Sequence, residues 1–573
     1  MKKIILFICI GLLSGLKINA QKILKENLSK KVNFYYDVHR NILESSGFYY
    51  VDKVNKNSTI KHGKWMYYSR LGDLEQELNY YKDQLHGAVL YYYPGKRKKE
   101  EGYFKMGLQD SIFRQWNEMG KLQVEGNYKD GKPTGIWSYF YLDGRLKSVE
   151  EIKDTVSYML SFYYSDSLHT QTIKDGNGYL EEFYTTGALK SYYPYKNGLK
   201  DGAFEERSIY GYLTLSGSFK EGLKDSTWTY AYYTGETEKI SNYKAGLLDG
   251  PYRYFYDKNR INVEGQYADG KKTGTWTWYT NKGTRDMQGE FLNDKQHGDW
   301  TYWYATGEIS YTAHFKEDLK TGQWTYLYKN GSKFKEGSFL EDEKDGIWKT
   351  WYENGTLLME GAYEKGKEKG EWSNYWESGK LKDKSTFKDG KLHGEWISMT
   401  PDGKVKSKGE YKEGNKSGEW LIYFDNGKVK DIITYKVFSE KSKMNYGIMK
   451  DFKTEESKMH GLYISFSSKD FKKTEEGNYK EGEKDGEWIA YHPGGKFPAV
   501  ITHYKKGKLD GWMEQYDRRG NIISKTQYKD GLKDGKFLVY NEKGKVIVEK
   551  EFKEGMQVID DPRYQNGSFT PGR

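Results

Sequence analysis

Cysteine is almost absent from this sequence, since Cys9 is the single example in 573 residues. Cys9 lies inside an apolar run near the N-terminus, so a chain cleaved after residue 20 would contain no cysteine. This absence excludes disulfide bridges, thiolate zinc sites and a cysteine nucleophile in the mature chain.

Proline is also scarce, with 9 residues against 64 glycines, which is unlike collagen and unlike many disordered tracts. Hydrophobic residues make up 36% of the chain and the mean hydropathy is −0.94. Aromatic residues nevertheless reach 17%, whereas disordered segments are poor in them. The composition therefore indicates a folded chain whose apolar surface consists mainly of Tyr, Trp and Phe rings.

Charge of one sign is not concentrated anywhere. The 92 basic and 82 acidic residues give a net charge of +10, and the two signs alternate in stretches such as "YKDGK" and "FKEGL". A nucleic-acid-binding protein usually gathers its basic residues in one run or on one element. We therefore expect no nucleic-acid partner.

Long hydrophobic runs are missing apart from one that extends from Ile4 to Leu16. A basic start, this short run and the small residue Ala20 before Gln21 predict a secretory signal peptide over residues 1–20. The run is too short for a good transmembrane helix. We expect an exported protein that is periplasmic, outer-membrane-associated or secreted, with membrane contact at most peripheral.

Repetition is the dominant feature of the sequence, and its period is 24 residues. We number each copy from a recurring glycine, the repeat glycine, as position zero. Ser111 and Ser226 replace this glycine in two copies, two steps are 25 residues long and two are 43. About 19 copies fill residues 61–556, with irregularities near 150–177 and 436–460. Residues 21–60 are expected to form a divergent cap and residues 557–573 a tail. The repeat glycines are Gly63, Gly87, Gly135, Gly178, Gly202, Gly250, Gly274, Gly298, Gly322, Gly346, Gly370, Gly394, Gly418, Gly461, Gly486, Gly511 and Gly535.

Each copy has an apolar residue at position +2, aromatic residues at +4 to +6, and usually glycine at +9. Lys96, Asn259 and Asp470 replace the +9 glycine. Asn and Asp tolerate positive φ best after glycine, which indicates a turn and not a ligand contact. The expected core residues are Trp276, Trp300, Trp324, Trp348, Trp372, Trp396 and Trp420, and the expected turn glycines are Gly283, Gly307, Gly331, Gly355 and Gly379.

Two short aromatic runs separated by Asn-Gly, Thr-Gly or Asp-Gly are typical of a β-hairpin. A single hairpin is marginally stable, so neighbouring hairpins must stack and cooperate. The sequence predicts an all-β fold of tandem antiparallel hairpins in an elongated, twisted single-layer sheet.

Positions +2 and +5 are both aromatic, yet their odd spacing places them on opposite faces of a regular strand. Either a bulge realigns them or both faces carry rings. If both faces carry rings, the candidate contact aromatics are Tyr279, Trp303, Trp351, Tyr375 and Tyr423.

Catalytic chemistry is not apparent in the sequence. Five of ten histidines precede the repeat glycine, where Asp and Thr also occur, so this is a polar turn position. His297 and His393 are four repeats apart and too distant to share a metal. The glycines match no phosphate-binding motif. We expect no enzyme, no cofactor and no metal.

The pattern Gly-x-Trp-x-x-Tyr-Tyr-x-x-Gly, followed by Leu-x-x-x-Gly-x-Tyr-x-x-Gly, resembles the bacterial variant of the MORN repeat over roughly residues 60–556. The same variant occurs in proteins labelled YwqK-type antitoxins, although a signal peptide would separate this chain from a cytosolic toxin. The resemblance implies antiparallel hairpins in an elongated sheet and a scaffolding role, and it supplies no catalytic residue.

The leading hypothesis is an exported, non-enzymatic repeat scaffold that binds an unknown protein or envelope component along its length. A cell-wall or polysaccharide binder that stacks exposed rings on glycan is the alternative. Peripheral binding to anionic lipid is the third hypothesis.

Overall fold

A computed structural model describes residues 27–54, 56–257, 259–442 and 452–558. The expected signal peptide, the start of the expected cap and most of the expected tail lie outside the described residues. Every regular element within the described ranges is a β-strand, and none of those residues forms a helix. The described residues therefore contain no helix that could span a membrane. The all-β prediction is confirmed.

The chain divides into two units. Unit 1 covers residues up to Thr273 and also Asn281–Gly283, and unit 2 covers Gly274–Thr280 and the chain from Thr284 onward. The strands of unit 1 are β1 (Val32–Tyr35), β2 (Leu43–Tyr49), β3 (Lys61–Tyr68), β4 (Leu74–Tyr81), β5 (Gln84–Tyr93), β6 (Arg97–Lys105), β7 (Leu108–Gln109), β8 (Ser111–Trp116), β9 (Leu122–Lys129), β10 (Lys132–Phe140), β11 (Leu146–Lys153), β12 (Val156–Tyr163), β13 (Gln171–Lys174), β14 (Asn177–Phe183), β15 (Leu189–Lys196), β16 (Leu199–Lys200), β17 (Gly202–Arg207), β18 (Leu213–Lys220), β19 (Leu223–Ala231), β20 (Thr237–Lys244), β21 (Leu247–Asp257) and β22 (Arg260–Ala268).

Strand β23 (Lys271–Tyr279) begins in unit 1 and continues in unit 2. The remaining strands of unit 2 are β24 (Arg285–Leu292), β25 (Lys295–Trp303), β26 (Ile309–Lys316), β27 (Leu319–Leu327), β28 (Lys333–Leu340), β29 (Glu343–Trp351), β30 (Leu357–Glu364), β31 (Lys367–Tyr375), β32 (Leu381–Lys388), β33 (Lys391–Met399), β34 (Val405–Lys412), β35 (Asn415–Tyr423), β36 (Val429–Ser442), β37 (Phe452–Phe466), β38 (Lys473–Lys480), β39 (Glu483–Tyr491), β40 (Pro498–Lys505), β41 (Lys508–Tyr516), β42 (Ile522–Lys529), β43 (Leu532–Tyr540), β44 (Val546–Lys553) and β45 (Met556–Val558).

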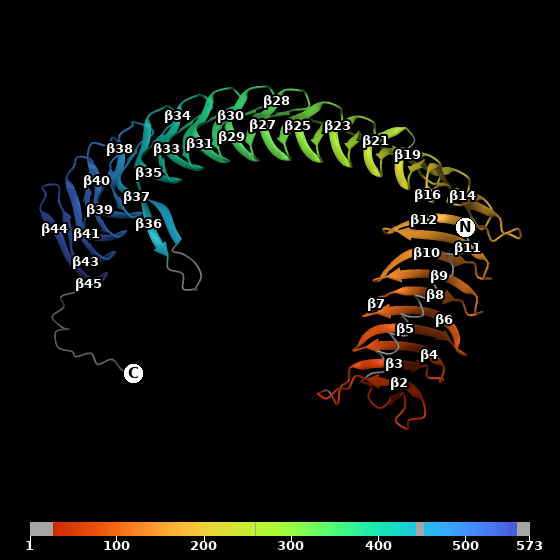
Figure 1. Cartoon of the computed structure of the whole chain (residues 1–573). Helices are drawn as coiled ribbons and strands as arrows, with labels where there is room; N and C mark the ends of the chain where they lie inside the picture. Colours follow the sequence, from red (N-terminus) through yellow and green to blue (C-terminus); the bar gives the residue numbers. More distant parts are fainter. Residues whose placement is uncertain (1–26, 55, 258, 443–451, 559–573) are drawn as a thin grey trace. The chain divides into compact units, whose positions relative to one another are not determined.

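Within each unit the strands follow one another in chain order, and neighbours pair antiparallel (Figure 1). The main contacts of each strand are with its neighbours in this row, so among the described residues no second sheet covers either face within a unit. The predicted tandem hairpins in a single layer are therefore confirmed.

Two kinds of turn alternate along the row. In the first turn of the copy at Gly298, the Gly307 amide donates to the Tyr304 carbonyl at 2.8 Å, and Gly307 has φ +107°. In the second turn, Lys316 pairs with Leu319, and the two residues between them, Glu317 and Asp318, have φ +52° and +72°. Two successive positive φ angles define the two-residue hairpin turn that matches strand twist.

One turn differs from its expected position. Lys96 and Asn259 have positive φ at the +9 position, +59° and +76°, but positive φ near Asp470 falls on the following residue, Phe471, at +56°. The step from Gly461 to Gly486 is one residue longer than usual. The extra residue lengthens this turn and moves its left-handed position along by one.

The question of ring placement is settled by the strand register. Trp300 pairs with Ala313 and Trp303 pairs with Ile309, and strand β25 runs regularly between Trp300 and Trp303. A register shift lies on the partner strand, so it does not rotate β25. Positions +2 and +5 therefore lie on opposite faces. We call the face with positions +2, +4, +15 and +17 the ring face.

The core on the ring face is a chain of alternating rings that passes from repeat to repeat. Phe315 lies between Trp300 and Trp324, with centroid distances of 5.9 and 5.3 Å. Phe339 continues the chain from Trp324 to Trp348 at 5.2 and 5.0 Å. Edge-to-face geometry of this kind adds stability beyond area burial. Each ring thus belongs to two repeats, which makes neighbours depend on one another.

The tryptophan at +2 lies flat on a glycine of the preceding strand, eleven residues earlier. A Cβ atom at Gly289 would overlap the Trp300 ring, and the same is true of Gly361 below Trp372. The Trp300 indole Nε1 then donates to the next carbonyl, that of Glu290, at 3.2 Å. Glycine at +15 therefore leaves room for the ring to lie directly on the backbone of the preceding strand.

Six of the seven expected core tryptophans are buried. Their exposed fractions lie between 1% and 6%, for Trp276, Trp300, Trp324, Trp348, Trp372 and Trp420. Trp396 departs from the expectation because it is only half-buried. Its partner on the preceding strand is Ser385 and not glycine. The ring of Trp396 instead approaches Trp420, at 5.3 Å.

Hydrogen bonds join successive repeats along both edges of the row. At second turns, a backbone amide donates to a carbonyl of the preceding second turn, as Gly390 does to Glu368 at 3.0 Å. At first turns, the +6 tyrosine hydroxyl donates to the +5 carbonyl of the next repeat. Tyr304 donates to Leu327 at 2.8 Å and Tyr328 to Trp351 at 2.9 Å. These bonds supply contacts that an isolated hairpin lacks.

The two long steps of the repeat have different structures. Between Gly135 and Gly178, strands β12 and β13 form an additional hairpin, with Phe162 buried. Between Gly418 and Gly461, the strands β36 and β37 are themselves lengthened, and their hairpin extends beyond the neighbouring strands (Figure 1). The first step thus contains a degenerate copy, and the second contains an extended hairpin.

Candidate functional site

The face opposite the rings carries positions +1, +3, +14 and +16, and we call it the polar face. Cross-strand pairing brings +1 opposite +16 and +3 opposite +14, as in Glu395 with Glu410 and Ile397 with Lys408. Residues directly opposite each other share a face and have Cβ atoms about 5 Å apart. The polar face is therefore a regular grid of side chains that recurs every repeat.

Several charges of this grid are paired across neighbouring strands in unit 2. Lys384 lies 2.9 Å from Glu371, and Lys349 lies 3.6 Å from Glu360. His314 Nδ1 lies 2.7 Å from Asp299 Oδ1. Exposed ion pairs like these contribute little stability individually. They leave the polar face charged and open to solvent.

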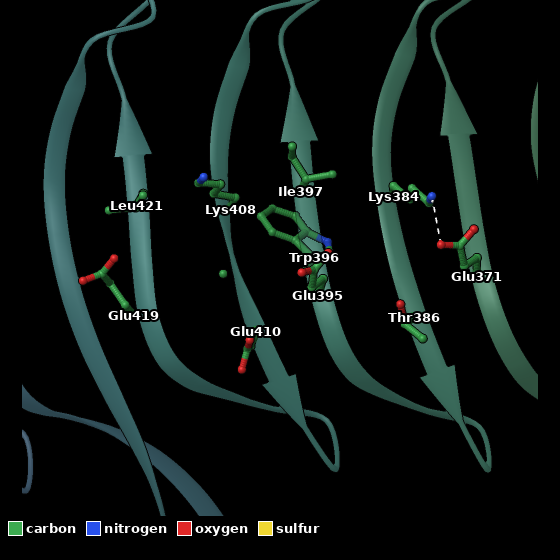
Figure 2. A pocket seen from close by; sticks show the side chains of 11 residues that line it. Glu371, Lys384, Thr386, Glu395, Trp396, Ile397, Lys408, Glu410, Glu419 and Leu421 are labelled. Atoms are coloured by element: carbon green, nitrogen blue, oxygen red, sulfur yellow. Dashed lines mark ion pairs between the residues drawn. The ribbon is translucent and has the colours of Figure 1, made fainter.

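A groove of about 390 Å³ lies across strands β31 to β35 on the polar face (Figure 2). Its walls carry Glu371, Glu395, Glu419, Glu410 and Lys384, the last of which pairs with Glu371. Trp396 and Gly409 are also in its lining, and strand alternation assigns them to the ring face. The groove therefore combines carboxylates with a floor of sheet backbone.

The expected contact aromatics at +5 are half-buried, and none of the five is fully exposed: Tyr279, Trp303, Trp351, Tyr375 and Tyr423. The Arg285 guanidinium carbon is 5.8 Å from the Trp303 ring centroid, and the Lys333 ammonium is 5.6 Å from that of Trp351. The Tyr375 hydroxyl donates to Glu360 at 3.1 Å. These rings lie at the border between the polar face and the first-turn edge. Neighbouring charged side chains already contact Trp303, Trp351 and Tyr375.

The expected turn glycines all have the left-handed conformation. Their φ angles are between +82° and +107°, for Gly283, Gly307, Gly331, Gly355 and Gly379. Ser111 and Ser226, which replace the repeat glycine, also have positive φ, +67° and +60°. Position zero therefore has a positive φ even where serine replaces glycine.

Burial perturbs tyrosine side chains on both faces of the sheet. Burial, and next the neighbouring Tyr302, raise the pKa of Tyr311 well above its ordinary value. Burial and the Glu476 carboxylate raise the pKa of Tyr491 to about 12, and burial and Glu514 do the same for Tyr516. No group of three His, Cys, Asp or Glu residues in the described ranges is arranged to hold a metal.

Sequence reasoning missed two kinds of residue. A lysine two residues before the repeat glycine places its ammonium over the +2 tryptophan, as Lys484 does over Trp488 at 3.7 Å and Lys416 over Trp420 at 4.3 Å. The recurring "KDG" and "KSG" stretches contain this signal. The second kind is an exposed aromatic cluster at first turns of unit 1, where Tyr210 is 76% and Tyr233 72% exposed. No periodic signal marks these two residues.

A family model described as the MORN repeat variant matches residues 296–317, 344–365, 368–389, 392–413 and 416–436. The chain carries MORN variant repeats. These MORN repeats all lie in unit 2, and three of the matched segments contain residues of the groove. The match to this repeat family suggests a repeat scaffold for interactions.

No curated protein matches the chain. Among solved structures, the crystal structure of TcdB2-TccC3-Cdc42 is 12% identical, with 92% of this chain and 30% of that chain covered and a TM-score of 0.12. The Tc holotoxin pore of Photorhabdus luminescens is 11% identical, with 89% and 30% covered and a TM-score of 0.12. The chain thus spans about 30% of the length of these chains. Likeness at this level carries no argument about function.

Proposed function

We propose that this protein is an exported, non-enzymatic scaffold that binds a partner protein or an envelope component along the polar face of unit 2. One observation carries the proposal: within the part of the chain that the structure describes, no second layer covers the polar face, although the opposite face is filled by rings. A grid repeated every 24 residues offers the same contact many times. Weak contacts of one kind then add up along the row.

The +5 rings favour a protein partner over a glycan. Stacking on sugar requires an open ring face, and cations already lie over the rings of Trp303 and Trp351. The polar face instead presents charged and apolar side chains together, such as Glu395 beside Ile397. Such a mixture is typical of protein interfaces.

Site-specific photo-crosslinking in the native host tests the docking face. A photoreactive amino acid at Gln323 or Ile347, both exposed at position +1, should crosslink to one defined partner. The same amino acid at Lys365, exposed in a second turn at the edge, is the matched control. Crosslinks from Lys365 equal to those from the polar face would refute the proposed binding face.

Export has a separate test. Fractionation of the host should place the protein outside the cytoplasm, and mass spectrometry should find Gln21 as the first residue. A protein that stays in the cytoplasm with residues 1–20 attached would refute export and would leave the docking proposal to the crosslinking result.

A further inference from the structure

The polar face of unit 2 differs in charge from the chain as a whole. The complete chain has a net charge of +10. Between strands β24 and β35, however, acidic residues outnumber basic residues at positions +1, +3, +14 and +16. The acidic residues are Glu290, Asp299, Glu336, Glu360, Glu371, Glu395, Glu410 and Glu419, and the lysines are Lys349, Lys384 and Lys408. This part of the polar face is therefore acidic although the whole chain is basic.

Within the groove, the ion pairing stops after one repeat. Glu371 pairs with Lys384, but the equivalent residues of the next repeat, Glu395 and Lys408, form no ion pair. In the described part of the chain, the carboxylates of Glu395, Glu410 and Glu419 have no hydrogen-bond or ion-pair partner. The groove therefore has three uncompensated carboxylates beside one free lysine.

Two of these carboxylates oppose each other directly. Glu395 pairs with Glu410 in the register of β33 and β34, so their side chains are cross-strand neighbours on one face. Like charges in this arrangement destabilise a sheet. A cationic partner would remove the repulsion, whereas an anionic one would increase it.

The carboxylates at +1 are spaced by the repeat. Glu371, Glu395 and Glu419 occupy this position in three consecutive repeats. One repeat adds two strands of about 4.8 Å each, which gives about 10 Å between successive carboxylates. A polyproline II helix has three residues per turn and rises about 3.1 Å per residue, so its side chains at every third position share one face and are about 9 Å apart.

We infer that this groove binds a segment of the partner in the polyproline II conformation that carries Lys or Arg at every third position. The segment runs along the row, across the strands, and its cations meet the carboxylates of successive repeats. The half-buried side chains of Ile397 and Leu421 contact the residues between the cations. This inference rests on the proposed docking function and names the chemistry of its partner.

Fluorescence anisotropy with the full-length protein tests the spacing. The probes are two labelled peptides of identical composition, one with lysine at every third position over nine residues and one with its lysines in a single block. The spaced peptide should bind at least about tenfold more tightly than the block peptide, and its affinity should fall as salt rises. Equal affinity of the two peptides would overturn the inference.

Charge-neutral variants test the location. The combined substitution Glu395→Gln, Glu410→Gln and Glu419→Gln should weaken binding of the spaced peptide at least about tenfold. The matched control changes three exposed turn carboxylates, Glu341→Gln, Glu353→Gln and Glu377→Gln, and should change affinity less than twofold. Equal losses in the two variants would show a non-specific charge effect and would overturn the inference.

The two proposals fail separately. If the spaced peptide does not bind but Gln323 still crosslinks to one partner, the docking face stands and the cationic spacing is wrong. If crosslinks arise equally from Lys365, the docking face is wrong whatever the peptides do.

Discussion

Gly289 is a position where a small change should have a large local effect. Its α-carbon lies beneath the Trp300 ring, and a Cβ atom there would overlap the ring. Ala313, the equivalent residue before Trp324, shows that one methyl group can be accommodated, since Trp324 is still only 5% exposed. We therefore expect Gly289→Ala to cost about 1–3 kcal/mol, the usual cost of overpacking.

A β-branched side chain at position 289 is too large for the Trp300 ring to stay above it. With Gly289→Val, the Trp300 ring must leave its site, which is 1% exposed in the native protein. The loss should approach that of deleting a buried tryptophan, about 3–5 kcal/mol. The ring is also shared with Phe291 and Phe315, at 5.3 and 5.9 Å, so both neighbouring hairpins should loosen.

Native-state hydrogen exchange is the appropriate assay because a long repeat array does not unfold in two states. Amides of β24 to β26 should exchange roughly 10²- to 10⁴-fold faster in Gly289→Val, at about 1.4 kcal/mol per tenfold. In the background Trp300→Ala, adding Gly289→Val should have little further effect. Unchanged exchange in the single variant, or an equal added effect in the Trp300→Ala background, would refute the overlap as the cause.

Three further predictions concern other positions. Trp324→Ala should cost about 3–5 kcal/mol because the ring is 5% exposed, and unchanged exchange of β26 to β28 amides would place the ring outside the core. Gly307→Val should open the first turn after β25, since a β-branched residue resists the φ of +107° found there, and native circular dichroism together with native exchange of that turn would contradict this. Tyr491 and Tyr516, whose pKa values are about 12 in the folded protein against about 10 when unfolded, should stabilise the fold fully below pH ~10 and lose this contribution as pH rises through about 12. Tyrosinate absorbance should therefore show a late-titrating fraction that decreases in Tyr491→Phe and Tyr516→Phe, and an unchanged titration would count against the assignment.

The fold was largely predictable because the same hairpin pattern recurs in every copy of the repeat. Glycine or its substitutes at turn positions marked each hairpin, and the buried +2 tryptophans followed from the same period. The role of the glycine at +15 was not predictable, because it depends on a ring that packs from another strand. For the same reason, the presence of Ser385 did not predict from the sequence that Trp396 is half-buried.

The candidate site was harder to predict from the sequence than the fold. The +5 rings were expected to offer contacts, but their exposure depends on neighbours such as Arg285 and Lys333, which strand register brings close. The groove combines residues of six repeat positions from three repeats, so no single stretch of the sequence displays it. Pairing of Glu395 with Glu410 likewise appears only once the register of β33 and β34 is known.

Covalent footprinting of the intact protein tests most directly the claim that one face is packed with rings while the other remains open. Carboxylate and indole labelling would be read in the same sample by mass spectrometry. We predict rapid labelling of Glu395, Glu410 and Glu419 and strong protection of Trp300, Trp348 and Trp420. Protected glutamates together with readily labelled tryptophans would contradict the account.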